Sequence, residues 1–71
     1  MADKSREALS IERRKQVQAR TGLGRSSIYD GVRAGTFPAP VRIGARSVGW
    51  LAHEVDAWIS AQVERSRSNS A

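Results

Sequence analysis

The sequence lacks the residues from which stapled or catalytic sites are commonly built. It has 71 residues, no cysteine and a single histidine. The absence of cysteine excludes disulfides and thiolate metal sites, and His53 alone provides neither a Cys–His pair nor a multi-histidine site. We therefore predict no cofactor, no bound metal and no enzymatic activity. We expect His53 to be an exposed polar residue near the start of a helix.

Long apolar segments are missing as well. No uncharged apolar run approaches the ~20 residues that a membrane-spanning helix needs. The first ten residues carry Asp3 and Glu7 and no apolar stretch, so they do not resemble a signal peptide. A chain of this length forms one domain at most. Together with the missing cysteines, these features predict a cytoplasmic protein without a membrane partner.

Positive charge is present in excess, and it is unevenly distributed. The formal net charge is +5. Residues 20–49 carry five arginines and one acidic residue, Asp30, whereas residues 50–71 carry two arginines and three acidic residues. A basic segment of this kind is typical of proteins that bind a polyanion such as nucleic acid. A surface that serves solubility alone is the alternative that the charge leaves open.

The first part of the folded region is predicted to contain an arm and a helix. Leu9 and Ile11 alternate with polar neighbours, which indicates a short strand or N-terminal arm. Good helix formers predict a helix over residues 13–20. Gly22 and Gly24 then break this helix and permit a sharp turn.

A second helix is predicted at Arg25–Ala34. Ile28 and Val32 lie four residues apart and can share its buried face. Gly24 is an acceptable N-cap, and a glycine follows the predicted C-terminus. Gly31 within this helix is expected to be a local defect that costs ~0.5–1 kcal/mol relative to alanine.

A small hairpin is predicted after two prolines, which favour an extended path. Its strands are residues 41–43 and 47–50, around a glycine-containing turn. Its inward face is expected to hold Val41, Ile43 and either Val48 or Trp50. Its outward face and tip are expected to hold two arginines.

The last predicted element is an amphipathic helix. One apolar stripe is formed by Leu51, Val55, Trp58 and Ile59. We place the folded domain at residues 9–65, between flexible tails at 1–8 and 66–71. The order helix, glycine turn, helix, hairpin, helix predicts a mainly α fold with a small β-hairpin, a winged helix-turn-helix in which the second helix enters the DNA major groove.

Three blocks of the sequence also resemble a known family. They are TGLGRSSIY (Thr21–Tyr29), GTFPAPVRIGAR (Gly35–Arg46) and GWLAHEVDAWI (Gly49–Ile59). In their order and spacing they resemble the AlpA family of prophage regulators, which are small MerR-like winged-helix proteins related to phage excisionases. The resemblance implies a DNA-binding protein that controls transcription. Gly24 stands where the family usually has serine, and Asp30 where it commonly has a basic residue.

Candidate contact residues follow from the basic and hydroxyl side chains of the predicted elements. We predict DNA contacts from Arg25, Ser26, Ser27, Tyr29, Arg33, Arg42 and Arg46. Further phosphate contacts are predicted at the start of the first helix, from Arg13, Arg14 and Lys15. Helix N-termini bind phosphate, and arginine binds phosphate or guanine. For Tyr29 the alternative is a half-buried core position, and for the arginines a solvated surface.

The predicted partner is double-stranded DNA, bound by a nucleoid-associated transcriptional regulator. We expect a second copy of the protein on adjacent DNA sites, because a module this small makes a limited DNA contact. The alternatives are an excisionase, which bends attachment-site DNA and works with an integrase, and a protein-interaction module built on the Trp50/Trp58 helix. Asp30 is expected to pair with Arg33 at i+3.

Overall fold

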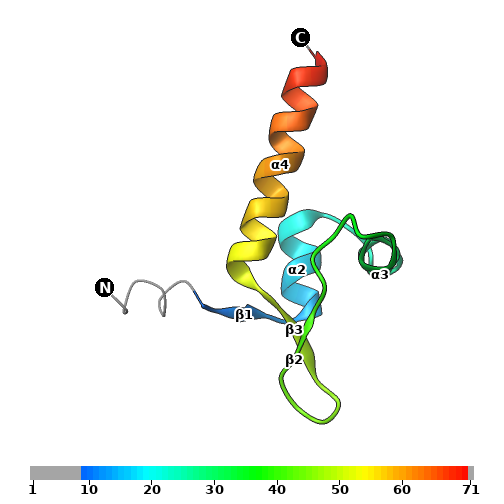
Figure 1. Cartoon of the computed structure of the whole chain (residues 1–71), viewed down its shortest axis with the longest axis vertical. Coiled ribbons are helices and arrows are strands. Elements are labelled where there is room, and N and C mark those ends of the chain that lie inside the picture. Colours follow the sequence, from blue (N-terminus) through cyan, green and yellow to red (C-terminus); the bar gives the residue numbers. More distant parts are fainter. Residues whose placement is uncertain (1–8, 71) are drawn as a thin grey trace.

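The computed structural model describes residues 9–70, and within them two short helices and one long helix surround a small sheet (Figure 1). The elements in chain order are β1 (Ile11–Glu12), α2 (Arg14–Thr21), α3 (Arg25–Ala34), β2 (Val41–Arg42), β3 (Val48–Leu51) and α4 (Ala52–Ser70). The β2–β3 hairpin projects from one end of the molecule, and α4 projects from the other. This is the mainly helical architecture with a small hairpin that the sequence predicts.

The domain boundaries at residues 9 and 65 stay predictions. The predicted tail at residues 1–8 lies outside the described residues. At the other end, α4 continues to Ser70, five residues beyond the boundary that we placed at residue 65. Glu54 in its first turn and Arg67 in its last turn both complement the helix dipole. Residues 66–70 are therefore helical, and their flexibility stays a prediction.

The turn between α2 and α3 is organised by one glycine and one hydroxyl. Gly22 has a φ of 76°, and its N–H donates to the carbonyl of Gln18 at 2.8 Å, which ends α2. The Thr21 hydroxyl donates to the carbonyl of Val17 and accepts from the N–H of Leu23. Leu23 is half-buried and packs against the core. The turn thus fixes the angle between the two helices.

The sheet has the strand order β1-β3-β2, with both pairs antiparallel. Ile11 pairs with Leu51 and Val41 pairs with Gly49. Gly49 is required by close packing, because a Cβ there would lie 2.4 Å from Cγ2 of Ile11. The predicted N-terminal strand is therefore confirmed. It adds to the β2–β3 hairpin as an edge strand beside β3.

The core lies between the sheet and the helices. Its buried side chains are Val17, Ile28, Phe37, Trp50 and Val55. Two tryptophans also bind the segment that follows α3. Nε1 of Trp50 donates to the carbonyl of Pro38, and Nε1 of Trp58 donates to the carbonyl of Thr36, each at 2.8 Å. Phe37 packs edge-on against both tryptophans, with ring centroids 6.5 and 5.0 Å apart.

The expected faces of the first hairpin strand are wrong: Val41 and Ile43 were expected on the inward face and Arg42 on the outward face, and the register reverses all three. Ile43 was expected on the inward face, but 43% of it is exposed. Side chains alternate between the faces of a strand, and the buried Trp50 defines which face is inward. The pairing of Arg42 with Val48, two residues before Trp50, puts those side chains on the inner face. Val41 and Ile43 consequently belong to the opposite, outer face of the sheet.

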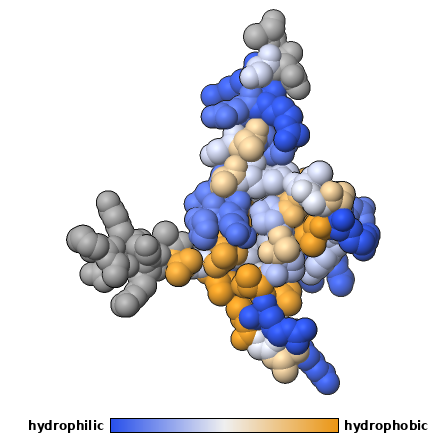
Figure 2. All heavy atoms as spheres, in the orientation of Figure 1, coloured by the Kyte–Doolittle hydropathy of each residue, from blue (hydrophilic) through white to orange (hydrophobic). Residues whose placement is uncertain are grey.

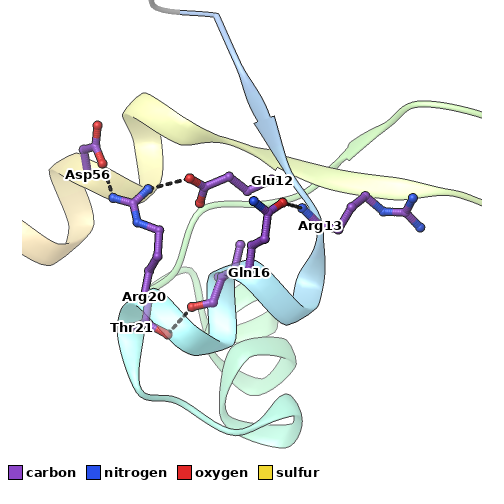
Figure 3. Close-up of polar contacts among 7 residues, drawn as sticks. Glu12, Arg13, Gln16, Arg20, Thr21 and Asp56 are labelled. Carbon is purple, nitrogen blue, oxygen red and sulfur yellow. Dashed lines mark hydrogen bonds and ion pairs between the residues drawn. The ribbon is translucent and has the colours of Figure 1, made fainter.

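An ion-paired clasp joins three elements at the edge of the core (Figure 3). Arg20 of α2 binds Glu12 of β1, with Nη1 and Oε2 2.7 Å apart, and it also binds Asp56 of α4. Hydrogen bonds to Asp56 and Glu12 raise the pKa of Arg20 above its ordinary value. Arg20 therefore stays charged in the clasp. Its bond to Asp56 connects residues 36 positions apart in the sequence.

These elements make a winged helix-turn-helix. α2, the glycine turn and α3 form the two-helix unit, and the β2–β3 hairpin is the wing. Among residues 9–70, no helix combines the length and apolar character that a membrane crossing requires.

Candidate nucleic-acid interface

A basic basin lies where the start of α2, the middle of α3 and the wing meet. It has a volume of about 370 Å³. It is lined by Arg13, Arg14, Lys15, Tyr29, Arg46 and Val48. Five of these six are predicted contact residues, drawn from three separate elements. The basin is therefore a concave surface with four cationic side chains and one phenol.

The start of α2 supplies three of the four cations. Arg13 is its N-cap, and the Arg13 N–H donates to Oε1 of Gln16 at 3.1 Å. Nε of Arg14 donates to Oε1 of Gln18 at 3.1 Å, which orients the half-buried arginine along the helix. The first backbone N–H groups of a helix lack intrahelical partners and carry partial positive charge. The helix start and its side chains thus favour an anion together.

Tyr29 links the basin to the core of the protein. It is half-buried, and its ring lies 6.0 Å from the ring of Trp50 with an interplanar angle of 59°. The guanidinium carbon of Arg25 lies 6.0 Å from the Tyr29 ring centroid, a cation–π distance. Tyr29 is therefore both a half-buried residue packed on the core and part of the basin wall, and its contact with DNA stays a prediction.

The wing supplies the fourth cation of the basin. The N–H groups of Ile43 and Gly44 both donate to the carbonyl of Ser47, at 2.9 and 3.2 Å, and this closes the turn. Arg46 lies within the turn and lines the basin. Arg42 is exposed on β2 but is not among the basin-lining residues. The wing therefore places one of its two arginines in the basin.

The remaining predicted contacts lie along α3 outside the basin. Ser26 and Ser27 are exposed in its first turn. Nη2 of Arg33 lies 2.5 Å from Oδ1 of Asp30, so the predicted i, i+3 pair is confirmed. Both side chains are well exposed, at 75% and 67%. Arg33 is thus partly neutralised on the helix that is predicted to enter DNA.

The comparisons with known proteins agree with this architecture. Residues 10–63 match the family model of the prophage CP4-57 regulatory protein (AlpA). The chain belongs to the AlpA family. It is 37% identical over 62 residues to the DNA-binding transcriptional activator AlpA of Escherichia coli (strain K12), an alignment that covers 79% of this chain and 89% of that protein. It is also 45% identical over 42 residues to the uncharacterized protein ORF88 of Enterobacteria phage P4.

AlpA-family membership confirms the resemblance seen in the three sequence blocks. The match to ORF88 covers 59% of this chain, which spans about half of the length of that phage protein. The matching family model is described as that of a regulatory protein.

Sequence reasoning missed one basin residue, Val48. It also missed the contacts of Thr21 and Arg20, which connect the elements around the basin. Val48 was expected on the inward hairpin face only as an alternative to Trp50, and its position with Tyr29 in the basin wall depends on the tertiary fold. Thr21 and Arg20 were not singled out at all. A threonine in a helix can donate to the carbonyl four residues earlier, which is a local contact, whereas the Arg20 clasp joins elements distant in sequence and leaves no local pattern.

Proposed function

We propose that this AlpA-family protein is a sequence-specific double-stranded DNA-binding regulator of transcription encoded by a prophage or mobile element. In this proposal α3 enters the major groove and the wing holds the flanking backbone or minor groove. The observation that carries it is the basic basin, in which the start of α2, α3 and the wing converge on one surface. The function named for the Escherichia coli relative agrees with it.

The basin suits the DNA backbone. A phosphate held there would contact Arg13 and Lys15 at the start of α2 and Arg46 on the wing. Such contacts fix the register of a protein on the duplex without reading bases. Base readout would then come from α3, whose exposed positions include Arg25 and Arg33. Affinity would depend mainly on phosphate neutralisation and would fall steeply with salt.

A gel-shift titration against tiled fragments of the neighbouring genome tests this function. Wild-type protein should shift one promoter fragment in the presence of excess competitor DNA, at two salt concentrations. Arg46→Glu should abolish the shift, because it reverses one charge of the basin. Arg65→Glu is the matched control, since Arg65 is exposed on α4 and lies outside the basin. Circular dichroism should show that both variants are folded.

Other outcomes of the same titration decide against this proposal. A specific shift of an attachment-site arm, with DNA bending, would instead indicate an excisionase that acts with an integrase. Binding that competitor removes entirely would indicate electrostatic attraction alone, and a protein-interaction module would then be the better interpretation. Equal loss of binding in Arg46→Glu and Arg65→Glu would show that the basin is not a specific part of the contact surface.

A further inference from the structure

The outer face of the three-stranded sheet is apolar and uncovered by any described part of the chain. Leu9, Ile11 and Ile43 are 58%, 43% and 43% exposed, and they are three of the four large apolar residues that the described chain exposes. Strand pairing puts Ile11, Leu51 and Val41 on the face opposite Trp50. Leu9 precedes Ile11 by two positions, and the Ser10 carbonyl accepts a hydrogen bond from the Ala52 N–H.

A groove extends this face toward α4. It has a volume of about 500 Å³ and is lined by Pro38, Ala39, Pro40, Val41, Glu54 and Ala57. Val41 belongs to both the groove and the sheet face, so the two form one continuous surface. Figure 2 shows apolar surface gathered between the N-terminal strand and the base of the wing. We call this surface, formed by Leu9, Ile11, Val41, Ile43 and the groove, the outer apolar face.

We propose that the outer apolar face is the surface through which a second copy of this chain binds beside the first on DNA. Charge supports a second copy as the occupant. The chain has a net charge of +5, so two copies repel one another over most of their surface. The four strand residues on this side of the sheet, Ile11, Val41, Gly49 and Leu51, carry no charge, and neither does Ile43, which follows β2. Among the described residues that line the groove, the charged one is acidic, Glu54. A second basic chain therefore meets less repulsion there than at the basic basin.

The position of the face also suits a second copy. The basic basin includes Val48, which lies on the inner side of the sheet, and the outer apolar face lies on the other side. Contact through the outer face therefore leaves both basins and both α3 helices free for DNA. This part of the inference relies on the proposed DNA-binding function.

The size of the face indicates association that depends on DNA. A few apolar side chains per copy form an interface at the small end of the range, below about 1,200 Å² in total, where association is weak or transient. Adjacent DNA sites raise the local concentration of the second copy and make weak contacts effective. One module of this size buries only about 600–1,000 Å² on DNA, so a neighbour contributes a large share of the stability of the complex.

The test compares duplexes with one site and with two adjacent sites. The variants are Leu9→Ser and Ile43→Ser, both at exposed positions. The control is Val63→Ser, because Val63 is 41% exposed on α4 and lies outside the outer apolar face. We expect wild type and Val63→Ser to bind the second site at least ten-fold more tightly than the first. Leu9→Ser and Ile43→Ser should lose most of this ratio, and Leu9→Ser should keep its one-site affinity.

Sedimentation of the DNA complexes supplies a second readout. Wild type should form a complex of two chains on the two-site duplex at concentrations where Leu9→Ser forms a complex of one. Unchanged cooperativity in both Leu9→Ser and Ile43→Ser would overturn the proposal while leaving DNA binding intact. Loss of cooperativity in Val63→Ser instead would assign the contact to α4. Absence of one-site binding by the wild type would contradict the proposed function itself.

Discussion

Gly31 and Phe37 approach so closely that a Cβ on Gly31 would lie 2.8 Å from the Cβ of Phe37. The chain turns back at this point: the N–H groups of Thr36 and Phe37 both donate to the Gly31 carbonyl, at 2.8 and 3.1 Å. Gly31 is thus the position in α3 that lets the following loop place Phe37 in the core. By helix propensity alone, Gly31 was predicted to be a defect in the helix. Its cost in helix propensity is offset by packing that is visible only in the folded chain.

The first prediction is that Gly31→Ala destabilises the protein although alanine is the better helix former. Alanine would gain about 0.5–1 kcal/mol in helix propensity, but overpacking of a tight core costs about 1–3 kcal/mol. The Cβ of Phe37 is fixed to the backbone and cannot rotate away. Urea unfolding followed by circular dichroism should show a lower midpoint. A midpoint equal to or above that of the wild type would show that the loop relaxes without cost.

The second prediction is that Gly24→Ser stabilises the protein. Gly24 is the N-cap of α3 and has ordinary extended backbone angles of −82° and 170°. It has no side chain to accept a capping hydrogen bond from the first turn of the helix. No atom lies within 4 Å of an added Cβ. A serine hydroxyl would accept from a free N–H of the first turn, and the unfolded chain would lose entropy, for a combined gain of about 1 kcal/mol.

Differential scanning calorimetry provides the measurement for this variant. A gain of about 1 kcal/mol corresponds to a rise in Tm of about 4–8 °C for a domain of this size. Gly22→Ser is the matched control, because the φ of 76° at Gly22 is unfavourable for serine and its Tm should fall. If both variants shift the Tm in the same direction, the cap is not the cause.

The third prediction concerns the Arg20 clasp. Arg20→Ala should lower stability more than Asp56→Ala, because it leaves Glu12 without its partner. The Glu12 side chain is only 13% exposed and its Oε1 has no hydrogen-bond partner among residues 9–70, whereas Asp56 is 61% exposed. Loss of an exposed partner such as Asp56 costs at most about 1 kcal/mol.

The pH dependence of the clasp has a definite sign. Because the folded state raises the pKa of Arg20, the arginine contribution is complete below the ordinary arginine pKa and is lost only as the pH rises through the raised value. The difference in unfolding free energy between wild type and Arg20→Ala should therefore be constant between about pH 6 and pH 9. A difference that shrinks over this range would mean that another group carries the interaction.

Local patterns in the sequence predicted the parts of the fold that depend on neighbouring residues. The bounds of α3 and the glycines at its ends follow from capping and helical spacing. The pairing of β1 with β3, the close contact of Gly31 with Phe37 and the reach of Arg20 to Asp56 join distant segments, and no local pattern specifies them. The face of Ile43 was assigned wrongly because alternation gives two faces, and only the burial of Trp50 shows which one is inward.

In the candidate site, too, single residues could be predicted from local patterns, whereas their arrangement could not. Charge and helix position indicated Arg13, Arg14, Lys15 and Arg46 individually. Their convergence on Tyr29 required the tertiary fold, which brings the start of α2 beside the wing. The i, i+3 pair of Asp30 and Arg33 was predictable because it lies within a single helix.

The fourth prediction follows from that pair. Asp30→Asn should increase affinity for DNA, since it releases Arg33 and removes a negative charge from the helix that is proposed to enter the major groove. An exposed pair of this kind is worth about 0.2–1 kcal/mol, so at low salt we expect an increase of up to about five-fold, and less at high salt. Glu64→Gln is the control, because it changes the net charge equally at an exposed position on α4. Fluorescence anisotropy with a fixed duplex provides the measurement. An equal gain in both variants would reflect net charge alone, and a loss of affinity in Asp30→Asn would mean that Asp30 orients Arg33 for its contact or accepts a hydrogen bond from a cytosine amino group.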